Sequence, residues 1–228
     1  MAPWVRWGLA GTIALGAVLG LQLQLDRMPS REVEVNMLFV PNAALTQHAA
    51  SGFENLVADG LWLDLLQYYG GHLGLENWHM KNLGPMFGLI TDLDPHFWFA
   101  YWLGAWALGD NHQADTAIAI LKKGEARNPN DYNYPYLEGF IHFLDRHDYT
   151  DAATCFLRAA ALPGAPRFAR SMAARMVETE GKEQLALQLW QGIYSNAADA
   201  ATKAIAKRNV QRVEAEIAGK RPPTFKPD

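Results

Sequence analysis

The stretch "FAYWLGAWALGDNHQADTAIAILKKGEARNP" (residues 99–129) is followed by a second stretch of similar design, "YPYLEGFIHFLDRHDYTDAATCFLRAAALP" (residues 134–163). Each holds two apolar segments with helical spacing, a polar turn between them and a proline at the end. Pro95, Pro129 and Pro163 are 34 residues apart. This repetition predicts that the chain is built from stacked helix pairs.

Small and large side chains recur at equivalent positions of the two stretches. Gly104 matches Gly139 and Ala117 matches Ala152, so that the two helices of a pair can approach closely. Large side chains then fill the space between one helix pair and the next. A third, weaker copy of the repeat follows these two stretches. The residues expected to pack within and between repeats are Gly104, Ala117, Leu121, Pro129, Gly139, Ala152, Phe156, Ala159, Pro163, Ala186 and Trp190.

The pattern resembles the tetratricopeptide repeat (TPR) family, in which an aromatic residue and Leu-Gly mark the first helix and a proline closes the repeat. The resemblance covers about residues 50–197 and implies a helix–turn–helix solenoid. Glu138 departs from the family pattern by replacing a leucine, and Gly124 by replacing an alanine. Residues 52–70 and 90–108 are also similar to bacterial membrane-anchored TPR proteins that have no assigned activity.

The repeat period sets the expected domain organisation. An all-α solenoid of three to four repeats is expected over 42–197, with repeats at about 42–95, 96–129, 130–163 and 164–197. The first repeat should begin with one long helix from about Asn42 to Tyr69. A capping helix is expected over 198–219, and Arg212 is expected on its solvent-exposed face. A tail follows over 220–228.

The N-terminal stretch 8–25 contains no charged residue, and its 18 residues would span about 27 Å as a helix, close to the thickness of a bilayer core. We expect a transmembrane anchor over 1–27 and an extended linker over 28–41. Arg6 before the span places the N-terminus in the cytoplasm and the repeats outside it. The alternative is a cleaved signal peptide, with Val18-Leu19-Gly20 as a substitute for an Ala-x-Ala site.

Small residues recur every four positions in this stretch, at Gly8, Thr12, Gly16 and Gly20. Such spacing forms a ridge on which another membrane helix can pack closely. Because glycine is common in membrane helices, the same spacing also fits a plain anchor.

The sequence gives little support for catalysis or for a cofactor. A net charge of −4 offers no case for nucleic-acid binding. A single cysteine, Cys155, is expected to exclude an intrachain disulfide framework and a zinc site built on cysteines. His142 and His147 are five residues apart, which suits two metal ligands on one helix face poorly. Asp94 before Pro95 is expected to cap a helix. We therefore predict no catalytic residue, no cofactor and no metal.

Aromatic residues gather on two stretches around Trp62 and Trp102. Most of these rings are expected to serve in packing, and the remainder to bind protein segments or lipid. The candidate partner-binding aromatics are Trp62, Tyr69, Phe97, Trp98, Phe99, Tyr101 and Trp102.

The expected function is that of a non-enzymatic scaffold, anchored in the bacterial inner membrane, whose periplasmic repeats bind other proteins of an envelope complex. The alternative is an accessory subunit of a membrane energy-converting or secretion/pilus complex, held mainly through its transmembrane helix. An enzyme is the third and least favoured class.

Overall fold

A computed structural model of the chain describes residues 38–72 and 80–219. The chain divides into two units, 1–37 and 38–228, and every described residue belongs to the second. The predicted anchor, the ridge of Gly8, Thr12, Gly16 and Gly20, most of the linker and the tail lie outside the described residues. Among the helices that are described, none combines the length and apolar character needed to cross a membrane.

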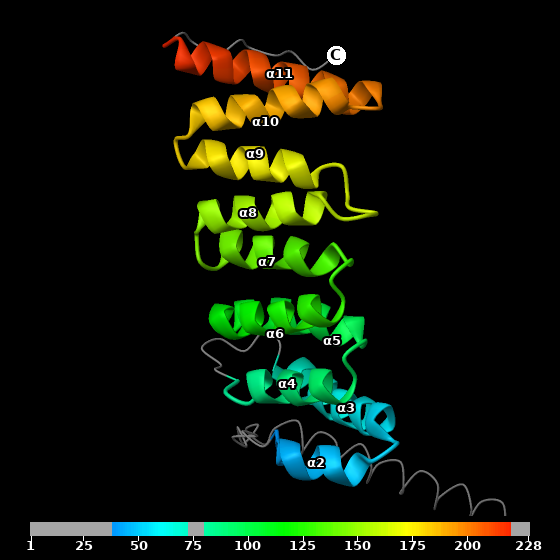
Figure 1. Cartoon of the computed structure of the whole chain (residues 1–228). Helices are drawn as coiled ribbons and strands as arrows, with labels where there is room; N and C mark the ends of the chain where they lie inside the picture. Colours follow the sequence, from blue (N-terminus) through cyan, green and yellow to red (C-terminus); the bar gives the residue numbers. More distant parts are fainter. Residues whose placement is uncertain (1–37, 73–79, 220–228) are drawn as a thin grey trace, which may run out of the picture. The chain divides into compact units, whose positions relative to one another are not determined.

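Residues 38–72 and 80–219 form ten helices and no strand (Figure 1). The helices are α2 (Ala43–Ala50), α3 (Glu54–His72), α4 (Leu83–Leu93), α5 (Trp98–Asp110), α6 (Ala114–Arg127), α7 (Asn133–Leu144), α8 (Tyr149–Ala160), α9 (Ala169–Thr179), α10 (Glu183–Asn196) and α11 (Ala200–Ile217). The architecture is all-helical and consistent with a helical solenoid.

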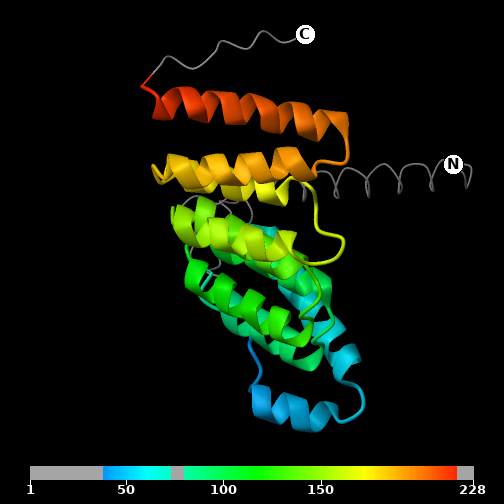
Figure 2. The same ribbon diagram turned by 45° about the horizontal axis from the view of Figure 1, so that its top comes forward.

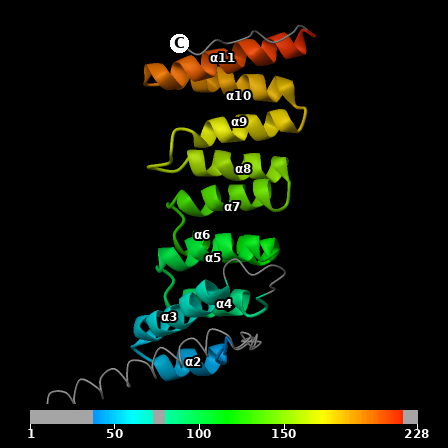
Figure 3. The same cartoon turned by 180° about the vertical axis from the view of Figure 1, so that it is seen from behind.

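Each helix packs against the next one in the chain from α2 to α11, as the views from the front and from behind both show (Figures 1 and 3). Contacts also join α4 to α6 and α5 to α7. Figure 2 shows α11 beside α10, as the last of the described helices. The buried apolar residues form three clusters along the stack: a large one from Leu38 to Ile141, and two smaller ones that contain Phe156 and Trp190.

The turns within three successive helix pairs share one backbone conformation. His112, His147 and Gly181 all have positive φ, at 58°, 53° and 72°. In the first and third of these turns, the next backbone N–H donates to a carbonyl five residues back, from Gln113 to Leu108 and from Lys182 to Val177. This is the Schellman arrangement that ends a helix. The turns therefore repeat in space with the period of the sequence.

Ion pairs join the second helices of successive pairs at similar, though not identical, positions of the repeat. Lys123 on α6 lies 2.7 Å from Asp92 on α4, and its Nζ also donates to the backbone oxygen of Gly88. Thirty-five residues later, Arg158 on α8 lies 3.2 Å from Glu125 on α6. A similar contact thus recurs along the stack.

The predicted long first helix is wrong, because the chain forms α2 and α3 instead. The two are separated at residues 51–53, where Gly52 adopts a φ of +88° that a right-handed helix does not contain. Asn42 caps α2 by accepting a hydrogen bond from the backbone N–H of Leu45 at 3.1 Å.

Asp94 does not cap α5 as predicted. Its carboxylate accepts a hydrogen bond from the backbone N–H of His96 at 3.0 Å, and α5 begins only at Trp98. The backbone N–H of Asp94 donates to Ile90, which ends α4. Asp94 therefore shapes the turn between two helices rather than starting the second.

Arg212 also lies elsewhere than predicted. Instead of facing solvent on the capping helix α11, its guanidinium makes two hydrogen bonds to the carboxylate of Glu178 on α9. These bonds hold the pKa of Arg212 above its usual value. On the opposite stripe of α11, Ala206 and Val213 are buried as an apolar cap requires.

The residues predicted to pack occupy two kinds of environment. Gly104 lies against the ring of Phe87, and Gly139 against that of Phe156. Pro129 and Pro163 are exposed in the turns after α6 and α8, so they end helices but do not pack. The remaining predicted residues are buried: Ala117, Leu121, Ala152, Phe156, Ala159, Ala186 and Trp190.

Candidate functional site

Four of the predicted aromatic residues form a connected row of rings across α3 and α5, here named the aromatic ridge. The ring of Trp62 lies 5.1 Å from that of Phe97 and 6.1 Å from that of Phe99, and Phe99 lies 5.2 Å from Trp102. Phe99 is 53% exposed and Trp102 is 38% exposed. The ridge thus has an outer edge that a binding partner can reach.

The other three predicted aromatics lie apart from this edge. Tyr101 is fully buried, so its prediction as a partner-binding residue is wrong: its ring packs 5.2 Å from Tyr134. Trp98 is half-buried beside the same tyrosine, at 5.3 Å. Tyr69 is half-buried, and burial, followed by the charge of Asp110, raises its pKa. The side chains of α5 divide in this way because a helix turns successive residues to different faces.

Large apolar side chains are also exposed on and beside α2 and α3. Among the large apolar side chains of the described residues, the five most exposed have between 59% and 79% of their surface accessible to solvent. They are named here the α2–α3 surface and comprise Phe39, Leu45, Phe53, Leu56 and Leu63. Soluble proteins rarely expose many large apolar side chains together, and such groups mark interaction sites.

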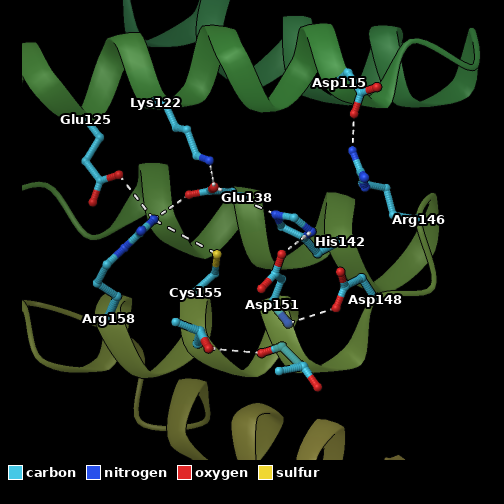
Figure 4. A network of polar contacts seen from close by, with 12 residues as sticks. Asp115, Lys122, Glu125, Glu138, His142, Arg146, Asp148, Asp151, Cys155 and Arg158 are labelled. Atoms are coloured by element: carbon cyan, nitrogen blue, oxygen red, sulfur yellow. Dashed lines mark hydrogen bonds and ion pairs between the residues drawn. The ribbon is translucent and has the colours of Figure 1, made fainter.

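A second candidate is a buried polar cluster between α7 and α8 that the sequence reading missed (Figure 4). Glu138 on α7 is buried, and its carboxylate is paired with Arg158 on α8. Lys122 on α6 approaches the same carboxylate at 3.4 Å. Arg158 also reaches Glu125, so that the cluster connects three helices.

His142 extends this cluster along α7. Its Nε2 lies 3.8 Å from Oε1 of Glu138, one helical turn earlier, and its Nδ1 lies 4.0 Å from Oδ2 of Asp151 on α8. Nδ1 is buried and has no hydrogen-bond partner among the described residues. Asp151 lies in the first turn of α8, where its backbone N–H donates to the capping carboxylate of Asp148.

Cys155 completes the cluster with a buried thiol on α8. Burial, followed by the nearby charge of Glu138, raises the pKa of this thiol to about 12. At neutral pH the sulfur therefore stays protonated, and a thiol is a poor nucleophile. The chemistry of the cluster by itself is that of a buried ion-pair network rather than of an activated cysteine.

This state of Cys155 has a measurable consequence. At pH 7.5 the native chain is expected to react with iodoacetamide at least about 100-fold more slowly than the same chain unfolded in urea, because the thiolate is scarce and the sulfur is buried. The reaction is followed by mass spectrometry. A rate in the native state within a few-fold of the unfolded rate would contradict the burial of Cys155.

One signal in the sequence pointed to the cluster. Glu138 replaces the leucine typical of the TPR pattern, and it is four residues before His142, which places both on one face of α7. His147, the other histidine near this position, lies exposed in the next turn. The approach of Cys155 from α8 depends on helix packing and was not readable from spacing within one helix.

The chain matches no protein-family model and no curated protein sequence.

Proposed function

We propose that the chain is a non-enzymatic, membrane-anchored helical-repeat scaffold that binds other proteins. The observation that carries this proposal is the exposure of large apolar side chains on and beside α2 and α3, together with the exposed edge of the aromatic ridge. Tryptophan and tyrosine are among the residues that most often supply the binding energy at protein interfaces, and exposed apolar patches mark interaction sites. The resemblance to the TPR family supports the same function, because stacked helix pairs commonly serve as binding surfaces.

The membrane part of the proposal rests on the uncharged stretch 8–25. As an anchor it would hold the repeats in the periplasm, at the surface of the inner membrane. The partner would then be a membrane or periplasmic protein of an envelope complex. The alternative, an accessory subunit held through Gly8, Thr12, Gly16 and Gly20, differs in which part of the chain makes the main contact.

Co-purification from native membranes tests the proposal and separates it from the alternative. The full chain is compared with a surface variant, Leu56→Ser with Leu63→Ser and Phe99→Ser. A matched control carries Leu185→Ser, Tyr194→Ser and Ile205→Ser, which are also exposed but lie on α10 and α11. Far-ultraviolet circular dichroism checks that each variant is folded.

We expect the surface variant to retain at most about a tenth of the co-purifying partner, since each lost anchor residue weakens binding by about 1–2 kcal/mol. The control should retain nearly all of it. Replacing residues 8–25 by an unrelated membrane helix should leave the complex intact. Loss of the partner only on this replacement would favour the accessory subunit, and no specific partner in any preparation would overturn both.

A further inference from the structure

The buried cluster between α7 and α8 brings together three side chains that commonly bind metal ions. A carboxylate oxygen of Glu138, a ring nitrogen of His142 and the sulfur of Cys155 all lie within 4.8 Å of one another, and all three residues are buried. Two ligands of a tetrahedral zinc ion are about 3.4 Å apart, given bonds of about 2.1 Å. The 3.8 Å between Glu138 Oε1 and His142 Nε2 is already close to that value.

An independent observation concerns the other nitrogen of His142. The side chain is only 8% exposed, yet Nδ1 has no hydrogen-bond partner among the described residues. It points towards Asp151, whose nearest carboxylate oxygen is 4.0 Å away (Figure 4). Buried polar atoms nearly always have a partner. A histidine that binds a metal through one nitrogen usually donates the other N–H to a carboxylate.

Two cationic side chains, Arg158 and Lys122, contact the carboxylate of Glu138, and each can be accommodated elsewhere when a metal ion binds. Arg158 also lies 3.2 Å from Glu125, and it keeps that contact if it leaves Glu138. The side chain of Lys122 is 59% exposed, so it can return to water. A divalent ion bound by one carboxylate and one thiolate replaces their positive charge without leaving excess charge in the core.

We propose that Glu138, His142 through Nε2, and Cys155 bind a divalent transition-metal ion, with Zn²⁺ as the preferred ion, and that Asp151 orients His142 through Nδ1. The mixed oxygen, nitrogen and sulfur donors suit zinc, whereas Mg²⁺ and Ca²⁺ take oxygen ligands. The sulfur binds as the thiolate, so its proton is released to solvent on binding. The fourth ligand is a water molecule. This site is independent of the proposed scaffold function.

Cobalt is the probe for the test, because Co²⁺ can occupy zinc sites and, unlike Zn²⁺, absorbs visible light. The full chain is purified in detergent without a histidine tag, stripped with a chelator and titrated with Co²⁺. We expect sulfur-to-cobalt charge-transfer absorption in the near ultraviolet together with intense visible bands of a tetrahedral ion, in a ratio of one ion per chain. Added Zn²⁺ should abolish both.

Three variants and a control test two of the ligands and the residue that orients the third. Cys155→Ser should lose the charge-transfer band, and Glu138→Gln should bind Co²⁺ at least about 10-fold more weakly. Asp151→Asn, at an exposed position, should weaken binding by about 10–100-fold while keeping the band. His147→Asn is the control, since the exposed His147 lies in the adjacent turn and asparagine tolerates its positive φ.

The proposal is overturned if the wild-type chain gives no sulfur-to-cobalt band. It is equally overturned if His147→Asn weakens binding as much as Asp151→Asn does, or if Asp151→Asn, shown to be folded by circular dichroism, binds Co²⁺ with wild-type affinity.

Discussion

Replacing Trp190 by alanine is expected to lower the free energy of unfolding by about 3–5 kcal/mol, the largest loss predicted for a single substitution in this chain. Trp190 is completely buried on α10, in a cluster with Ala174, Ile193, Ala206 and Val213. Two of these neighbours, Ala174 and Ala206, have side chains too small to fill the space that the indole leaves. The cavity therefore adds to the loss of apolar burial.

Urea unfolding followed by far-ultraviolet circular dichroism measures this effect. Because helical repeats can unfold in parts, hydrogen exchange should also locate the loss in α9, α10 and α11. Trp190→Phe should cost much less, since the indole Nε1 has no hydrogen-bond partner among the described residues and none is lost. Tyr194→Ala, one turn along the same helix and exposed, is the control; a similar loss there would contradict the assigned packing.

The second large effect is expected at Gly124 on α6. An alanine normally stabilises a helix by about 1 kcal/mol relative to glycine. Here a Cβ atom would lie inside van der Waals distance of the Tyr134 ring and 2.9 Å from Cδ1 of Tyr101. Both rings are buried and packed against each other, so neither can move away easily. Gly124→Ala should therefore destabilise the chain by about 1–3 kcal/mol.

Thermal unfolding of paired variants checks the sign of this effect. Gly88→Ala and Gly192→Ala are matched controls, because both glycines are helical and a Cβ there would meet no atom within 4 Å. The controls should raise the unfolding temperature and Gly124→Ala should lower it. If Gly124→Ala raised it as well, the close contact between α6 and the two tyrosines would be wrong.

Gly124 also shows how far the repeat pattern could be read. In the TPR pattern an alanine stands at this position, so the glycine is a departure from it. The structure gives the reason: Tyr134, at the start of α7, occupies the space of the alanine methyl group, and its hydroxyl accepts a hydrogen bond from Asn128 at 3.1 Å. A pattern of equivalent positions identifies an exception, but packing between helices explains it.

The helical character and the buried small residues were readable because they depend on periodicity along the chain. The break at Gly52 was not, since glycine occurs inside the described helices as well, as at Gly60. The burial of Tyr101 beside the exposed Phe99 depended on how α5 is rotated against its neighbours. The buried cluster at Glu138 required α7 and α8 to meet, a contact between side chains of different helices.

Photo-cross-linking in native cells tests the central claim most directly, that the chain binds a protein through the α2–α3 surface and the aromatic ridge. A benzophenone amino acid is placed in the full chain at Leu63 or Phe99, and in control chains at Leu185 or Tyr194, all of which are exposed. We expect light-dependent adducts with one defined protein from Leu63 and Phe99 and none from the controls. Adducts of equal yield from all four positions, or none to protein from Leu63 and Phe99, would contradict the claim.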